Sequence, residues 1–239
     1  MRNKNSYIII YTVALCVIAA SVLAVVKQSL TERQDENIAY DNKKKILNTV
    51  MDITVLSKAQ VDEIYANRVR PMIIDFKGVI QTDLKLKDVD VVKQKALKVE
   101  ERMLPIYRIL DEKDSTKNSY YVFPTSGSGL WDKISSFVAM ESDGKTIKGV
   151  SFSHVGETPG LGARIKSDAK IRLRYENKKM YADEFEPVAV YMVKSEGGDY
   201  SDDPHTVDGM SGATLTANGV NDMLKEYSLA YQNFFKSLN

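Results

Sequence analysis

The sequence predicts an α+β fold, in which one N-terminal transmembrane helix precedes one mixed α/β domain with an antiparallel sheet. Three observations support this prediction. An uncharged apolar run lies near the N-terminus, a β-hairpin pattern lies in the middle of the chain, and an amphipathic helix pattern ends it. We expect four segments: a cytoplasmic N-terminus at 1–6, a transmembrane helix at 7–26, a helical stalk or connector at 27–66 and an extracytoplasmic domain at 67–239.

The apolar run extends from Tyr7 to Val26 and contains no charge, proline or glycine. At ~1.5 Å per residue it covers a bilayer core of ~30 Å. A cleaved signal peptide is the alternative, but the run is longer than the ~7–15 residues usual for such a segment. Arg2 and Lys4 precede the run, and a mixed-charge segment follows it. We therefore expect a single-pass inner (cell) membrane protein with a cytoplasmic N-terminus and a periplasmic domain.

Local patterns predict the elements that follow the membrane span. The charged segment from Thr31 to about Met51 favours a stalk helix, and Ser57–Gln60 has a capping-box pattern that begins a short helix through Ala66. Pro71 disfavours helix just before it. The later expectations are a hairpin of ISSFVAM and TIKGVSFSH around the turn SDGK, a weakly periodic helix at 165–179, a strand at Val188–Val193, a long Gly- and Asp-rich connection at 194–212, and a final helix.

The final helix has a clear apolar stripe with i, i+3, i+4, i+7 spacing. Such a stripe is typical of a helix that packs on a core, and we assign it no other role. Its members are Val220, Met223, Leu224, Tyr227, Tyr231, Phe234, Phe235 and Leu238.

Composition excludes several classes of function. The 33 Lys and Arg residues balance 32 Asp and Glu residues, so no broad basic face for nucleic acid is expected. Cys16 is the single cysteine, which excludes an intramolecular disulfide and a CxxC site. The two histidines, His154 and His205, cannot form a zinc site alone, and we expect no metal site. Redox chemistry would therefore need an organic cofactor or the metal centre of a partner.

The stretch DGMSGATLT, from Asp208 to Thr216, gathers small and hydroxyl residues immediately before the final helix. If Ser211 or Thr214 caps this helix, Thr216 falls in or beside its first turn, where backbone N–H groups and the helix dipole favour an anion. A phosphate would fit there. The alternative is that Ser211 and Thr214 only cap the helix.

Two further glycine-rich clusters resemble this stretch in composition. HVGETPGLG, from His154 to Gly162, follows the predicted hairpin, and PTSGSGLW, from Pro124 to Trp131, holds the single tryptophan. Loops of this kind that end near one sheet edge can form a cofactor cleft, and an indole is a good platform for a planar ring. The alternative for Trp131 is a core position, and we expect His154 to be structural.

The motifs DGxSGATxT, HxxETPGLG and SGxGLW, together with the N-terminal span, resemble the C subunit of the Na⁺-translocating NADH:quinone reductase (Na⁺-NQR), of the FMN-binding domain family. The resemblance implies FMN attached covalently through a phosphoester to Thr216, installed by a separate flavin transferase that uses FAD. It implies no catalytic acid or base. The other implied cofactor-binding residues are Gly129, Leu130, Trp131, Glu157, Thr158, Gly160, Leu161, Gly162, Asp208, Ser211, Gly212, Ala213, Thr214 and Leu215.

The resemblance also implies that the chain carries electrons from an iron–sulfur centre in membrane subunits to a flavin on the B subunit, with the B, D and E subunits as its neighbours. The chain lacks GxGxxG and P-loop motifs, so we do not expect it to bind NADH. Asp208 would order its loop or assist the transferase, and Glu157 would influence flavin protonation. Ser128 departs from the basic residue of many relatives. The alternatives are the G subunit of an Rnf complex and a cofactor-free sensor or interaction domain.

Overall fold

A computed structural model describes residues 4–112, 114 and 117–238 of the chain. It contains two compact units, Met1–Lys43 and Lys44–Asn239, which we describe separately. Arg2, which contributed to the expected membrane orientation, lies outside the described residues.

The first unit is a single long helix. Helix α1 extends without interruption over Lys4–Leu47, so the expected span and the expected stalk form one helix, which ends at Leu47 and not near Met51. In the described part of the chain, Ser6–Leu47 is the one helix long and apolar enough to cross a membrane. The side chains of residues 7–26 are exposed throughout.

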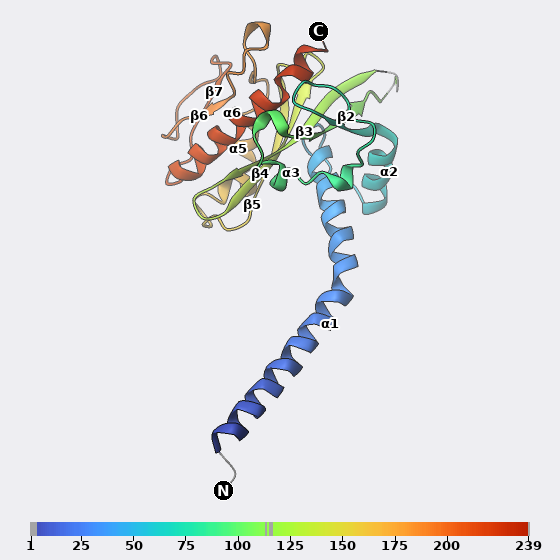
Figure 1. Ribbon diagram of the computed structural model, residues 1–239. Coiled ribbons are helices and arrows are strands. Elements are labelled where there is room, and N and C mark those ends of the chain that lie inside the picture. The colour runs from blue at the N-terminus through green and yellow to red at the C-terminus, as the bar shows by residue number, and fades with distance from the viewer. Residues whose placement is uncertain (1–3, 113, 115–116, 239) are drawn as a thin grey trace. The chain divides into compact units, whose positions relative to one another are not determined.

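The second unit is built on a five-stranded antiparallel sheet with the order β1-β2-β3-β4-β5 (Figure 1). A two-stranded parallel ladder of β6 and β7 lies apart from it. Its elements in chain order are α2 (Lys58–Arg68), β1 (Val69–Ile74), η1 (Leu86–Asp88), α3 (Val91–Gln94), η2 (Val99–Glu101), β2 (Leu104–Leu110), β3 (Asn118–Ser128), β4 (Lys133–Glu141), β5 (Ile147–His154), α4 (Arg164–Ser167), α5 (Ala169–Leu173), η3 (Asp183–Phe185), β6 (Tyr191–Met192), β7 (Thr206–Val207) and α6 (Thr214–Lys236).

Helix α2 begins with the predicted capping box. Gln60 N donates to Ser57 Oγ at 3.4 Å, and Ser57 N donates to Gln60 Oε1 at 2.9 Å. The helix ends at Arg68, slightly beyond the expected Ala66. Pro71 then lies in β1, an edge strand, where a missing N–H does not interrupt the interior of the sheet.

Helix α6 packs across one face of the sheet and contributes a large share of the core (Figure 1). The Phe123 ring of β3 lies 4.3 Å from the Tyr231 ring and 5.8 Å from the Phe235 ring, between centroids. All of the predicted stripe is buried except Leu238, which lies beyond the end of the helix and is exposed. The strand register places Phe152 on the same sheet face, where its ring meets Tyr175, so α6 and the segment after α5 share one core.

The opposite face of the sheet is covered by α2, the last residues of α1 and the residues that follow them. Gly149 on β5 comes so close to the backbone of Thr49 that an added Cβ would lie 2.4 Å from its carbonyl oxygen. Ile46, Leu47 and Val61 are buried outside the main core cluster. The sheet is therefore covered on both sides, which explains why β2 buries nearly every residue instead of alternating.

Several predicted elements differ from the structure. The hairpin of β4 and β5 is confirmed, but the expected strand at Val188–Val193 shortens to Tyr191–Met192, and Ala189 just before it has φ +60°. The expected helix at 165–179 is two short helices, α4 and α5, divided at Asp168, which caps the second one. Strands β1, β2 and β3 were not predicted.

Candidate cofactor site

A cavity of about 250 Å³ opens where the start of α6 faces the loop after β5. All three glycine-rich clusters contribute to its wall, although they are far apart in the sequence. The lining residues are Leu130, Glu157, Thr158, Leu161, Gly162, Gly212, Ala213, Thr214, Leu215 and Thr216.

Five of the residues expected at the site do not line this cavity: Gly129, Trp131, Gly160, Asp208 and Ser211. Gly129 and Trp131 adjoin it through Glu157: a Cβ at Gly129 would lie 2.2 Å from Glu157 Oε1, and Trp131 N donates to the same oxygen at 3.2 Å. Gly160 has φ +78°, a backbone conformation that favours glycine, and lies in open space. Asp208 and Ser211 belong to the supporting loop described below.

The start of α6 has no side-chain cap among the described residues. Its N-cap residue is Ala213, and neither Ser211 nor Thr214 makes a capping hydrogen bond, so the alternative in which these two residues only cap the helix is wrong. Gly212, with φ +75°, turns the chain into the helix. The N–H groups of the first turn have no intrahelical partner and carry the positive end of the helix dipole. A phosphate is the kind of group that such a helix start binds.

Thr216 lies in this first turn and makes a buried contact across the cavity wall. Its Oγ1 donates a hydrogen bond to Glu157 Oε2 at 2.5 Å. Thr216 is 1% exposed and Glu157 is 4% exposed. The other carboxylate oxygen of Glu157 accepts from Trp131 N at 3.2 Å, so residues from all three clusters meet at one carboxylate.

Two glycines make room for the Glu157 carboxylate. A Cβ at Gly162 would lie 2.3 Å from both Glu157 Oε2 and Thr216 Oγ1, and a Cβ at Gly129 would lie 2.2 Å from Glu157 Oε1. No side chain fits at either position without displacing the carboxylate. The glycines of the GLW and GLG motifs therefore shape this contact.

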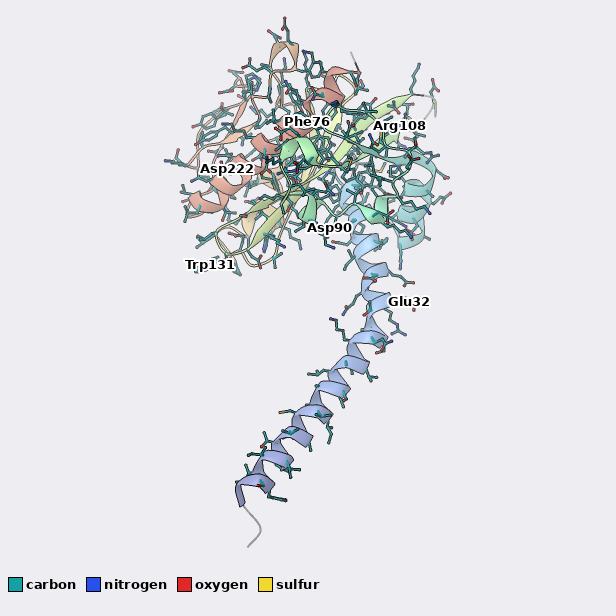
Figure 2. The ribbon with its side chains drawn as sticks, in the orientation of Figure 1. Glu32, Phe76, Asp90, Arg108, Trp131 and Asp222 are labelled. Atoms are coloured by element: carbon teal, nitrogen blue, oxygen red, sulfur yellow. The ribbon has the colours of Figure 1, made fainter. Side chains whose placement is uncertain are left out.

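Trp131 is a surface residue and not a core residue. Its side chain is 70% exposed, and Figure 2 shows it at the edge of the second unit. Its Nε1 donates to Thr158 Oγ1 at 3.2 Å, which holds the indole beside the loop after β5. The core alternative for this tryptophan is thus wrong, and an indole face remains available beside the cavity.

A charged network supports the DGMSG loop from behind. The carboxylate of Asp208 accepts from Gly197 N and Gly198 N, at 3.0 Å and 3.1 Å to its Oδ1. These bonds tie the DGMSG loop to Gly197 and Gly198, so Asp208 orders the loop. Glu196 bonds Arg164 at 2.7 and 2.8 Å and accepts from Ser211 N at 2.8 Å. The hydrogen bonds from Arg164, followed by the one from Ser211 N, hold the pKa of Glu196 well below its usual range.

Sequence reasoning did not find this network. Arg174 completes it: its guanidinium bonds Glu196 at 3.1 Å and lies 3.5 Å from Asp208 Oδ2. Arg164, Arg174 and Glu196 belong to segments in which no motif was recognised, and their spacing along the chain gave no signal of their contact.

His154 and Ser128 flank the site without lining it. His154 ends β5 on the core-facing register, opposite Ile134, and its Nδ1 is buried without a hydrogen-bond partner among the residues that the structure describes. Ser128 ends β3 as an exposed residue, and its carbonyl oxygen would lie 2.2 Å from a Cβ at Gly219. Gly219 thus lets α6 approach the end of β3 closely.

The site fits a phosphate-bearing planar cofactor in three respects: an uncapped helix start, a threonine hydroxyl in its first turn and an exposed indole beside the cavity. Residues 129–228 match the FMN-binding domain family. The C subunit of the Na⁺-translocating NADH-quinone reductase of Vibrio anguillarum is 31% identical over 231 residues, which cover 91% of this chain and 87% of the relative. This chain belongs to the same C-subunit family.

Membership of the C-subunit family confirms the resemblance drawn from the three motifs and decides between that family and the Rnf G subunit. The C subunit of Vibrio alginolyticus is 33% identical, over 91% of this chain and 87% of the relative. The crystal structure of the C subunit from Parabacteroides distasonis superimposes with a TM-score of 0.72 at 28% identity, over 86% of this chain and 96% of that one. The predicted fold class is confirmed as well.

Proposed function

We propose that this chain carries FMN through a phosphoester to Thr216 Oγ1 and transfers electrons within a sodium-translocating NADH-quinone reductase. The family of the chain and its FMN-binding domain support the coarser statement, an electron-carrying flavoprotein subunit. The redox chemistry is that of the flavin. The protein contributes its position, its surroundings and the exclusion of side reactions.

The observation that supports the attachment site is the position of Thr216. It combines a hydroxyl in the first turn of α6, a cavity that it lines and a helix start without a side-chain cap. A phosphoester at Thr216 Oγ1 would place the phosphate beside the free N–H groups of that turn. The helix dipole stabilises an anion at the helix start by only about 0.3–2 kcal/mol, which is too little to hold the cofactor. A covalent bond would hold it.

The cavity is too small to enclose an entire flavin. Its volume of about 250 Å³ lies below the ~300–1,000 Å³ typical of organic-ligand sites. The isoalloxazine ring would therefore lie partly outside, against the exposed side chains of Leu130, Trp131 and Leu161. A ring that is only partly covered leaves an edge open to the neighbouring cofactors of an electron-transfer chain.

The remaining parts of the proposal concern the membrane and the partners. Helix α1 anchors the chain in the inner membrane, with a cytoplasmic N-terminus and an extracytoplasmic flavin domain, as the charge distribution around residues 7–26 favours. The partners are the other subunits of the complex, with the B, D and E subunits as neighbours, and a flavin transferase that installs FMN from FAD. The proposal assigns no NADH-binding site to this chain.

The test is the intact mass and in-gel flavin fluorescence of the full chain, co-expressed with a flavin transferase. Thr216→Val replaces the acceptor, and Ser201→Val replaces an exposed loop hydroxyl as the matched control. We expect the mass of one FMN less water on the wild type and the control, and none on Thr216→Val. A folded wild type without the adduct, while the transferase modifies another substrate, would favour a cofactor-free domain instead.

A further inference from the structure

We propose that Glu157 acts as the proton acceptor when the FMN phosphoester forms on Thr216. The inference rests on the proposed function of Thr216 and extends it, because it assigns a catalytic residue for the attachment to this chain and not to the transferase alone.

The geometry of the pair is that of a nucleophile and its base. A threonine hydroxyl is a weak nucleophile at its own pKa and is activated by an adjacent base, which a third group orients. Thr216 Oγ1 donates to Glu157 Oε2 at 2.5 Å, and Trp131 N holds Oε1 at 3.2 Å. The three roles of nucleophile, base and orienting group are all present.

The surroundings show that the contact is built into the fold. Gly162 and Gly129 leave no space for a side chain beside the carboxylate, since an added Cβ would lie 2.3 Å and 2.2 Å from its two oxygens. Among the described residues, Arg164 and Arg174 form ion pairs with Glu196 and Asp208. Glu157 forms none with any residue that the structure describes. Among these residues, no cation competes with the Thr216 hydroxyl for the Glu157 carboxylate.

The proposed step balances without any redox change. The hydroxyl bond of Thr216 breaks, and its proton goes to Glu157 Oε2. A bond forms between Thr216 Oγ1 and the FMN phosphorus of a flavin dinucleotide held by the transferase. The pyrophosphate P–O bond breaks, and AMP leaves with that electron pair.

Access to the hydroxyl requires a movement of the cavity wall, because Thr216 is only 1% exposed. The turn from Thr158 to Gly162 contributes to this wall. Its Gly160 has φ +78° and faces open space, since an added Cβ there would meet nothing within 4 Å. Glu157 precedes this turn and is tied to Trp131 N at 3.2 Å. We infer that the turn opens while the Glu157–Thr216 pair stays in place.

The experiment measures the initial rate of FMN attachment by intact mass, with the full-length apo chain in detergent, a purified transferase and FAD. Glu157→Gln keeps the shape and a hydrogen-bonding oxygen but removes the proton acceptor, so we expect attachment to slow by about 10²–10⁴-fold. The deficit should shrink as the pH rises from about 6 to about 9, because hydroxide replaces the missing base. A purely structural role would not produce this pH dependence.

Glu226→Gln is the matched control. This glutamate lies on α6, as Thr216 does, and pairs with Arg102 at 2.6 Å, away from the cavity, so the same chemical change should leave the attachment rate unchanged. If Glu157→Gln does not fold, Glu157→Asp takes its place, since the shorter side chain withdraws the oxygen from Thr216.

The outcomes separate the two proposals. Attachment within about threefold of the wild-type rate in a folded Glu157→Gln, or in Glu157→Asp where that variant decides, overturns the role of Glu157 and leaves Thr216 as the acceptor. A wild type that gains no adduct from an active transferase removes the proposed function itself. A slow, pH-dependent Glu157→Gln beside a normal Glu226→Gln supports both.

Discussion

Replacing Gly162 with alanine should block FMN attachment by separating the two side chains that meet at this glycine. The added Cβ would lie 2.3 Å from both Thr216 Oγ1 and Glu157 Oε2, about 1 Å inside the 3.4 Å at which ordinary contact begins. Both neighbours are buried, so neither can simply swing into solvent. Overpacking of this kind costs typically about 1–3 kcal/mol of unfolding free energy.

Two assays on the full chain measure these effects. Chemical denaturation gives the change in the free energy of unfolding, and intact mass after incubation with transferase and FAD gives the rate of attachment. We expect Gly162→Ala to lose most of its attachment rate with only this moderate loss of stability.

Gly78→Ala is the matched control for the substitution itself. Gly78 has φ +81°, and a Cβ there would lie 2.8 Å from the backbone of Phe234, near the end of α6 and away from the cavity, so alanine crowds the fold without touching the site. Attachment to a folded Gly78→Ala should proceed normally. If Gly162→Ala is labelled as fast as the wild type, the tight contact among Gly162, Glu157 and Thr216 is not needed, and our reasoning about this site fails.

Three further predictions concern stability and tolerance. The pKa of Glu196 is lowered mainly by the Arg164 hydrogen bonds, so its stabilising effect is present above the usual carboxyl pKa of about 4.3 and is lost in more acidic solution; thermal unfolding of Glu196→Gln should approach that of the wild type as the pH falls, and a constant gap would refute this. Tyr231→Phe removes the buried bond to Pro105 O at 2.8 Å and should cost about 1 kcal/mol by denaturation; no change would mean that this carbonyl group is satisfied elsewhere. Ser128→Lys should leave attachment intact, because Ser128 is exposed and lines no part of the cavity; loss of the mass adduct would contradict this.

The elements that could be predicted are those whose signals are local. The capping box at Ser57, the β4–β5 hairpin and the stripe of α6 each follow from residues close in sequence. Strand β2 was missed because burial on both faces removes the alternation that marks a strand. Strand β3 was missed because its end, from Pro124 to Ser128, has the composition of a loop.

The site was predictable as a set of motifs but not as a set of contacts. Shared composition correctly indicated that three clusters meet, and all three line or support one cavity. The hydrogen bond between Glu157 and Thr216 joins residues 59 positions apart, and no local pattern reports such a pair. The alternative that Ser211 and Thr214 only cap the helix fails on the structure, because Ala213 is the N-cap residue and the Ser211 N–H bonds Glu196 in the supporting network.

The position of Trp131 gives the protein its own optical reporter. It is the single tryptophan of the chain, and it contacts Thr158 through its ring and Glu157 through its backbone. Tryptophan emission of the whole chain therefore comes from one place, beside the proposed attachment site. A flavin there would quench it, so opening of the turn and arrival of the cofactor are measurable in real time on an unlabelled, unmutated protein.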